Sequence, residues 1–81
     1  MNNYERVKEH LEKRGSITSW EAIKKYRITR LSHYIYLLRN EGYVINGEWQ
    51  TKERAGEHLR WKVYRLNRIE TEIRKHIPVI D

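Results

Sequence analysis

The chain has 81 residues, of which 38% are hydrophobic and 35% charged, and its 17 Lys and Arg against 11 Asp and Glu give a net charge of +6. A chain of this length forms one small domain, and the absence of cysteine excludes a disulfide framework and thiolate chemistry. No stretch is long and apolar enough to predict a membrane span, and the N-terminus shows no secretory apolar run, so we expect a cytoplasmic protein.

The positive charge is concentrated in the middle of the chain. Residues 24–68 carry eleven basic and four acidic residues, residues 1–23 carry four of each, and residues 69–81 carry two basic and three acidic ones. A basic segment in an otherwise neutral chain is typical of a protein that binds a polyanion, although a solvated surface that keeps a small protein soluble gives the same pattern.

Hydrophobic spacing predicts a first helix that ends before Gly15. Tyr4, Val7 and Leu11 recur at helical intervals, and charged residues fill the positions between them. Gly15 follows two basic residues, and a glycine after a basic last turn is a common helix end. Residues 16–18 then form a short extended link.

A second helix is predicted from Ser19 to about Lys25. Thr18, with Glu21 three residues later, fits a capping box at its start. We expect this helix to bury Ala22 and Ile23, with Trp20 or Tyr26 closing its edge.

A third helix is predicted from Arg30 to about Glu41, after a turn of about three residues in which Ile28 is the apolar plug. Thr29 is the candidate N-cap, and Gly42 ends the helix. Its buried stripe consists of Leu31, Ile35 and Leu38.

After Gly42 the hydrophobic period changes to about two, which predicts a β-hairpin of about eight residues a side. The first strand covers residues 43–51 and the second covers residues 59–66. We expect a kink or bulge at Asn46-Gly47, although such a pair can also make a tight turn. The polar residues 52–58, which include Gly56, are predicted as the loop between the strands.

A final helix is predicted after Asn67, its candidate N-cap, and it ends at Pro78. Its apolar stripe of Ile69, Ile73 and Ile77 either makes a homodimer or folds back onto the first helix over Val7 and Leu11.

The predicted fold is therefore mostly α with a small β-hairpin. The order of elements is that of a winged helix-turn-helix with three helices, a two-stranded wing and an extra C-terminal helix. Residues 1–66 make the winged domain, and residues 67–81 make the helix that packs on the core or dimerises.

The third helix carries polar residues on the face opposite its apolar stripe. In a helix-turn-helix this face enters the major groove of DNA, and its N-terminal residues meet base edges. Arg30 is suited to bidentate bonding with guanine. The candidates for base or phosphate contact are Thr29, Arg30, Ser32, His33 and Tyr36. An ordinary solvated helix is the alternative, but it usually mixes charges, and this face has no acid before Glu41.

Other basic and hydroxyl side chains are candidates for phosphate contact. The basic hairpin residues either contact the DNA backbone or keep strand edges from pairing with other chains. The amides at the start of the second helix can hold a phosphate, although capping alone explains the residues there. The candidates are Lys52, Arg54, Arg60 and Lys62 in the hairpin, Thr18 and Ser19 at the helix start, and Lys24, Lys25 and Arg27 around the turn.

No pattern for catalysis, a metal or a cofactor is present. The four histidines are far apart in the chain and have no cysteine partner, and no glycine-rich phosphate loop appears. We therefore expect no enzyme activity, no metal and no cofactor. Trp20, Trp49 and Trp61 are predicted to belong to the core, the alternative being base-stacking platforms for single strands.

Several stretches resemble the small helix-turn-helix domain family common in phages and prophages. The most specific are residues 15–22 (GSITSWEA) and residues 28–31 (ITRL), the latter followed by Ile35, Leu38-Arg39 and Gly42. The resemblance covers roughly residues 4–66, and Leu37 departs from it, since a polar residue is expected there. It implies a compact winged helix-turn-helix protein that binds DNA, of phage or bacterial origin.

Two functions stay open at this point. The first is a sequence-specific double-stranded DNA-binding protein of phage or prophage type, either a transcriptional regulator or an excisionase-like factor. The second is a protein-binding winged-helix module, such as a small phage-encoded inhibitor of a host protein, with the partner bound at Tyr36 and Leu37.

Overall fold

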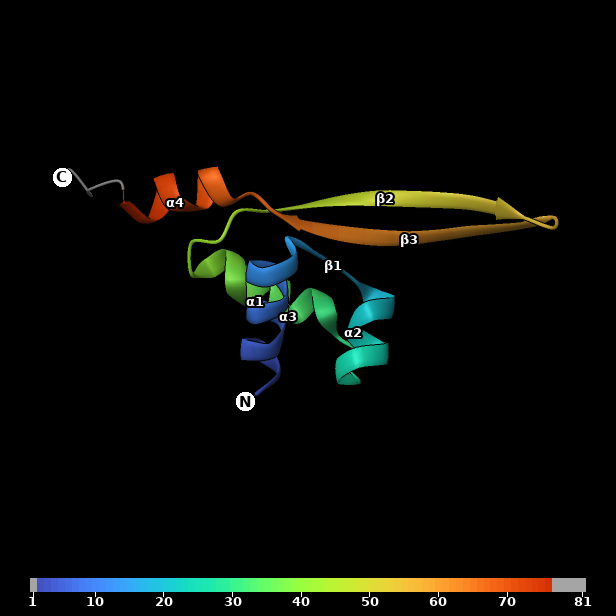
Figure 1. The fold of residues 1–81 in the computed structure, drawn as a ribbon, viewed down its shortest axis with the longest axis horizontal. Coiled ribbons are helices and arrows are strands. Elements are labelled where there is room, and N and C mark those ends of the chain that lie inside the picture. The colour runs from blue at the N-terminus through green and yellow to red at the C-terminus, as the bar shows by residue number, and fades with distance from the viewer. Residues whose placement is uncertain (1, 77–81) are drawn as a thin grey trace.

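The computed structural model describes residues 2–76 of the chain, which form four helices and a three-stranded antiparallel sheet. In chain order the elements are α1 (Asn3–Arg14), β1 (Ser16–Thr18), α2 (Ser19–Tyr26), α3 (Leu31–Asn40), β2 (Ile45–Arg54), β3 (Glu57–Leu66) and α4 (Arg68–His76). Helices α1, α2 and α3 gather on one side of the sheet, the β2–β3 hairpin extends beyond them, and α4 lies at the opposite end (Figure 1). None of the helices within residues 2–76 combines the length and apolar character needed to cross a membrane.

Local capping sets the bounds of the first two helices. The N–H of Gly15, which has φ +85°, donates to the carbonyl oxygen of Leu11 at 2.8 Å and ends α1. At the start of α2, the Thr18 hydroxyl accepts from the Glu21 N–H and the Glu21 carboxylate accepts from the Thr18 N–H, both at 3.1 Å. The predicted capping box is therefore confirmed.

The helix-turn-helix is formed by α2, residues 27–30 and α3. Ile28 is buried in the turn, as predicted, and its N–H donates to the carbonyl oxygen of Ala22 at 3.0 Å. The N-cap of α3 is Arg30, and its side chain makes no capping hydrogen bond. The prediction of Thr29 as the N-cap was wrong, because α3 begins at Leu31, one residue after the predicted start at Arg30.

The core lies between the three helices and the base of the sheet. It takes the apolar stripe of each helix together with the strand residues nearest the body. Its buried members are Val7, Leu11, Ile17, Ala22, Ile28, Leu31, Ile35, Leu38, Tyr43, Ile45 and Tyr64. Because a domain of this size buries little surface, each of these side chains contributes a large share of the stability.

The sheet differs from the predicted two-stranded wing. Its strand order is β1-β3-β2, because β1 pairs with the base of β3 as a third strand. The hairpin is also longer than predicted, since β2 and β3 pair continuously from Ile45↔Leu66 to Arg54↔Glu57. Residues 52–58 therefore form strand ends and a two-residue turn, not a loop.

Backbone pairing explains both corrections in the hairpin. Cross-strand hydrogen bonds join main-chain groups, so charged side chains do not prevent pairing in an exposed hairpin. Ala55 and Gly56 have φ +48° and +81°, the positive values that a tight hairpin turn requires. The predicted bulge at Asn46-Gly47 is absent, because both residues pair one to one with Arg65 and Tyr64.

Helix α4 packs on the body through a polar contact, not through its isoleucines. Asn67 caps the helix as predicted, its side-chain oxygen accepting from the Glu70 N–H at 2.9 Å. Thr71 is buried, whereas Ile69 is 75% exposed and Ile73 is also exposed. The predicted fold-back of the isoleucine stripe over the first helix was therefore wrong for these two residues. Ile77, the third member of the stripe, and Pro78 lie outside the described residues.

Candidate nucleic-acid interface

The outward face of α3 is exposed as the sequence predicted. Leu31, Ile35 and Leu38 are buried on the opposite face. The exposed residues of the helix and its entry turn include all five candidates, which are Thr29, Arg30, Ser32, His33 and Tyr36. Since α3 contains no acidic residue, this face presents no carboxylate to a phosphate backbone.

The remaining basic residue of α3 has a structural partner. Arg39 donates two hydrogen bonds, of 2.7 and 3.1 Å, to the carbonyl oxygen of Ile45. This contact ties the last turn of α3 to the start of β2. The position of the wing relative to α3 is therefore held at the base of the hairpin.

The register of the hairpin assigns its side chains to two faces. Residues directly opposite each other lie on the same face, and successive residues alternate. The face that includes the core residues Ile45 and Tyr64 is called the inner face. Farther from the body it carries the pairs Trp49↔Lys62 and Thr51↔Arg60.

Aromatic and basic side chains alternate along this inner face. The Arg60 guanidinium lies over the Trp49 ring, 4.2 Å from its centroid. The Lys62 ammonium lies 5.7 Å from the centroid of Trp49 and 5.4 Å from that of Tyr64. We call Trp49, Arg60, Lys62 and Tyr64 the inner-face strip.

The structure separates the four basic wing candidates into two pairs. Arg60 and Lys62 belong to the inner-face strip. Lys52 pairs with Leu59 and Arg54 pairs with Glu57, which places both in the register of the opposite, outer face. Each face also carries an ion pair, between Arg65 and Glu48 on the outer face and between His58 and Glu53 at the tip of the inner face.

A groove of about 370 Å³ separates the inner face of the wing from the helix-turn-helix. We call it the helix–wing groove. It is lined by Ser19, Trp20 and Ile23 of α2, by Thr29, Leu31 and Ser32 around the start of α3, and by Trp49, Arg60, Trp61, Lys62 and Tyr64 of the wing. The groove thus brings candidates from α2, α3 and β3 to one concave surface.

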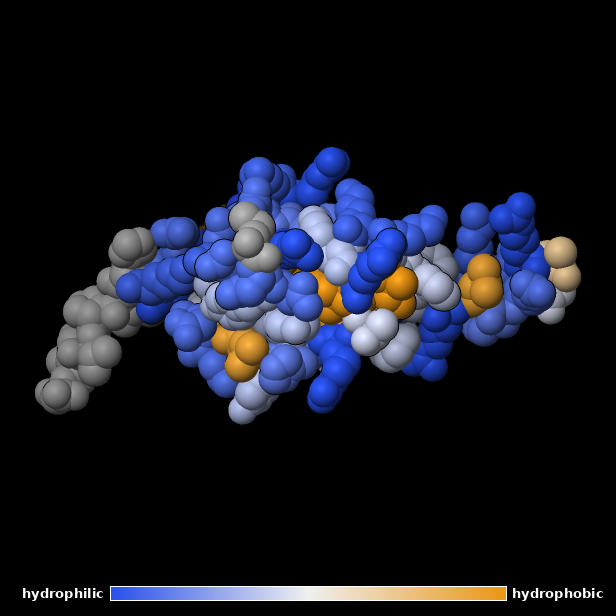
Figure 2. All heavy atoms as spheres, turned by 90° about the horizontal axis from the view of Figure 1, so that it is seen from below, coloured by the Kyte–Doolittle hydropathy of each residue, from blue (hydrophilic) through white to orange (hydrophobic). Residues whose placement is uncertain are grey.

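The face of the molecule on the helical side is mainly hydrophilic. Figure 2 shows hydrophobic atoms there as separate patches, both over the helical body and on the projecting hairpin. Hydrophilic side chains surround these patches. A surface of this kind suits a charged partner better than a broad apolar one.

The two candidates at the start of α2, Thr18 and Ser19, differ in how accessible their polar groups are to a ligand. Both the hydroxyl and the backbone N–H of Thr18 are engaged in the capping box with Glu21. Ser19 is exposed and lines the groove. Ser19 is therefore the better placed of the two for a ligand in the groove.

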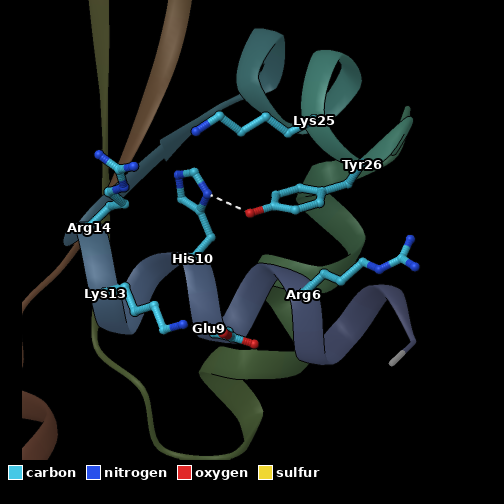
Figure 3. A pocket seen from close by; sticks show the side chains of 7 residues that line it. All are labelled: Arg6, Glu9, His10, Lys13, Arg14, Lys25 and Tyr26. Atoms are coloured by element: carbon cyan, nitrogen blue, oxygen red, sulfur yellow. Dashed lines mark hydrogen bonds and ion pairs between the residues drawn. The ribbon is translucent and has the colours of Figure 1, made fainter.

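Lys25 lies in a different place, in a pocket of about 470 Å³ between α1 and α2. Figure 3 shows it beside His10 and Arg14, with Arg6, Glu9 and Lys13 along α1. Lys24 and Arg27 are exposed around the turn and line neither this pocket nor the groove. The sequence candidates around the turn are thus not brought together with those of α3 and the wing.

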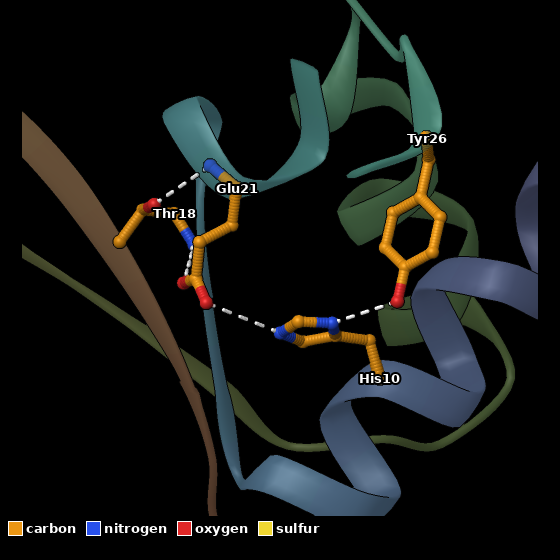
Figure 4. Close-up of polar contacts among 4 residues, drawn as sticks. All are labelled: His10, Thr18, Glu21 and Tyr26. Carbon is orange, nitrogen blue, oxygen red and sulfur yellow. Dashed lines mark hydrogen bonds and ion pairs between the residues drawn. The ribbon is translucent and has the colours of Figure 1, made fainter. Parts of the chain in front are cut away.

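The pocket between α1 and α2 contains a buried polar network. His10 Nδ1 and the Tyr26 hydroxyl share a hydrogen bond of 2.9 Å, and His10 Nε2 lies 3.5 Å from Glu21 Oε2 (Figure 4). Burial lowers the pKa of the His10 imidazole below its ordinary value of 6.5, as do Lys25 and Arg14, while Glu21 acts in the opposite direction. His10 therefore connects α1 to both ends of α2 chiefly as a neutral group.

The tryptophans are groove residues that the sequence interpretation assigned to the core, with base stacking as the alternative. Trp20 is 63% exposed and Trp49 is 55% exposed, so the prediction that they belong to the core was wrong. Ile23, also expected to be buried, is exposed in the same groove. Helix α2 has only eight residues and fully buries one of them, Ala22. Tyr26 packs against the edge of the core, whereas Trp20 and Ile23 lie outside it. Trp61, which alternates with basic residues in β3, is half-buried.

No group of three or more His, Asp or Glu side chains within residues 2–76 is arranged to hold a metal ion.

The chain matches the model of the winged helix-turn-helix domain family over residues 4–69. No curated protein and no solved structure matches it. The match spans α1 to the start of α4, which includes the helix-turn-helix and the whole wing. Winged helix-turn-helix domains in general bind DNA. The chain belongs to the winged helix-turn-helix domain family, and the family predicted from the sequence is confirmed.

Proposed function

We propose that this protein is a sequence-specific double-stranded DNA-binding protein. In this proposal α3 enters the major groove, where its exposed N-terminal residues meet base edges, and the wing contacts the backbone. Arg30 is the residue proposed to read guanine.

The observation that carries the proposal is the helix–wing groove. Thr29 and Ser32 from the α3 region and Arg60 and Lys62 from the wing line the same concavity. Arg and Lys side chains, together with the hydroxyl groups of Ser and Thr, are among the usual contacts to phosphate and sugar in protein–DNA complexes. A duplex whose major groove receives α3 has its phosphate backbone beside the inner face of the wing.

The same proposal includes the biological role. The protein acts in the cytoplasm of a bacterial host as a transcriptional regulator or excisionase-like factor of a phage or prophage, and this part rests on the sequence resemblance.

The proposal also includes a homodimer. A single winged helix reads few bases, and dimers read two half-sites about one helical turn apart or a multiple of it. The exposed isoleucines Ile69 and Ile73 of α4 supply an apolar surface for such a homodimer.

The test is a fluorescence-anisotropy titration of random duplex DNA at several salt concentrations. If about four to six phosphates are neutralised, the slope of log K against log salt is roughly −4 to −5. Absence of binding at low salt, or a slope near zero, contradicts DNA binding.

A second candidate function is the protein-binding module. The observation in its favour is Tyr36, which is 61% exposed on α3. Leu37, its proposed companion, is half-buried and adds little to an apolar surface. Failure of the duplex titration, with an intact fold, would favour this function.

A further inference from the structure

We propose that the helix–wing groove holds an unpaired nucleobase, so that the protein prefers duplex DNA that carries a single-stranded tail over blunt duplex DNA. The inference rests on the proposed function, which it deepens by naming the form of DNA. The base stacks on the aromatic side chains of the groove, and its phosphates lie on the basic residues beside them.

Two tryptophans from different elements carry this inference. Trp20 in the first turn of α2 and Trp49 in β2 both line the groove, and more than half of each side chain is exposed. Trp61 also borders the groove, although its pairing with Gln50 places it in the register of the outer face. Two large apolar ring systems from different elements are thus presented to solvent in one concavity.

Paired DNA offers these rings no matching surface. In a duplex the faces of the bases are covered by their neighbours, and the protein meets only base edges, sugars and phosphates. A wing that contacts only phosphates needs basic and hydroxyl side chains. An unpaired base exposes a planar π surface, and stacking on aromatic side chains is the usual way in which proteins bind single strands.

The inner-face strip supplies the rest of a nucleotide site. The Arg60 guanidinium already covers the Trp49 ring, and guanidinium planes are themselves stacking surfaces for bases. Lys62 lies within 6 Å of the Trp49 and Tyr64 rings, so its charge is close to any phosphate that follows a stacked base. Thr29 and Ser32 provide hydroxyl groups in the same groove.

The size and charge of the groove fit a nucleotide better than a protein side chain. Its volume of about 370 Å³ lies within the range of about 300–1,000 Å³ for sites that hold small organic molecules. Arg60 and Lys62 favour an anionic ligand, and the groove lining contains no acidic residue. An apolar peptide segment uses the tryptophans but offers no negative charge to Arg60 and Lys62.

The experiment compares two DNA ligands of the same duplex sequence, one blunt and one with a short single-stranded tail, in anisotropy titrations at one salt concentration. Each stacked base is expected to tighten binding roughly fivefold to 150-fold. Trp49→Leu, which keeps an apolar side chain but removes the ring, is expected to abolish the preference. Trp49→Phe keeps a ring and is expected to retain most of it.

Leu59→Ala is the matched control, because Leu59 is an exposed apolar residue of the same hairpin in the register of the outer face. It is expected to leave the preference unchanged. Thermal unfolding of each variant shows whether the protein is folded. If Trp49→Leu fails to fold, Trp20→Leu, which removes the other exposed ring of the groove, provides the test and is expected to reduce the preference.

The outcomes separate this inference from the proposed function. Equal affinity for blunt and tailed DNA overturns the inference and leaves the proposed function standing. A tail preference that survives in Trp49→Leu also overturns it, because the unpaired base is then held outside the stacking site at Trp49. Failure to bind either DNA overturns the proposed function and the inference together.

Discussion

The buried hydroxyl of Thr71 accepts a hydrogen bond of 2.9 Å from the backbone N–H of Val44 and donates one of 2.6 Å to the carbonyl oxygen of Asn67. This pair of bonds fastens α4 to the segment that leads into β2. The wing and the last helix are therefore held at the same point of the backbone.

Thr71→Val is expected to lower the free energy of unfolding by about 1–3 kcal/mol, because the part-buried N–H of Val44 loses its acceptor. Urea denaturation monitored by circular dichroism measures the change. Thr71→Ser keeps the hydroxyl and serves as the control. Equal stability of the Val and Ser variants would show that packing, not the hydrogen bond, holds α4.

Arg30→Ala is expected to weaken binding to a selected DNA site by about 1–3 kcal/mol and binding to random DNA much less, because Arg30 is proposed to contact base edges. The site is first obtained by enrichment from a random library. Equal losses on both DNAs would assign Arg30 to backbone positioning.

Lys62→Ala and Lys52→Ala are expected to differ because the register places them on opposite faces of the wing. Loss of the inner-face Lys62 weakens binding to all duplex sequences and reduces the salt slope by about one unit. Lys52 lies on β2, an edge strand, where a lysine discourages pairing with other chains. Lys52→Ala should leave the slope unchanged, and a larger effect at Lys52 than at Lys62 would reject the assignment of the inner face to DNA.

His10 makes the stability of the fold depend on pH. Its pKa is lowered in the folded state, so between that pKa and the ordinary value of 6.5 the unfolded chain binds more protons. The stability that neutral His10 contributes is thus complete above pH 6.5 and is lost as the pH falls through the folded pKa.

His10→Gln is therefore expected to show a shallower decline of stability than the unsubstituted protein as the pH falls from about 7 to about 5. Denaturation midpoints across this range provide the measurement. The charged groups that act on the imidazole are the same in both proteins, so a difference between the two pH profiles reports on His10 itself. These groups are Glu21, Lys25 and Arg14. Parallel pH profiles for the two proteins would contradict the effect.

The homodimer proposed through α4 is tested by sedimentation equilibrium. We expect the full chain to associate at high micromolar concentration, and the double substitution Ile69→Lys, Ile73→Lys to abolish association without loss of thermal stability, because both side chains are exposed in the single chain. A full-length chain that stays monomeric throughout this range rejects the dimer.

The sequence alone determined the features that depend on neighbours along the chain. The capping box of Thr18 and Glu21, the glycine end of α1 and the buried stripe of α3 follow from spacings of three or four residues, which a helix converts directly into contacts. Those local patterns were sufficient to predict the helix-turn-helix and its family.

Only the tertiary structure decided which residues share a surface. The faces of Lys52 and Lys62 depend on the register of the hairpin, and the register depends on the turn at Ala55-Gly56, where the polar sequence indicated a longer loop. A shift of one residue would move every side chain of a strand to the other face. Burial is likewise set by the three-dimensional packing, because a short helix and a projecting hairpin leave Trp20 and Trp49 outside the core despite their apolar character.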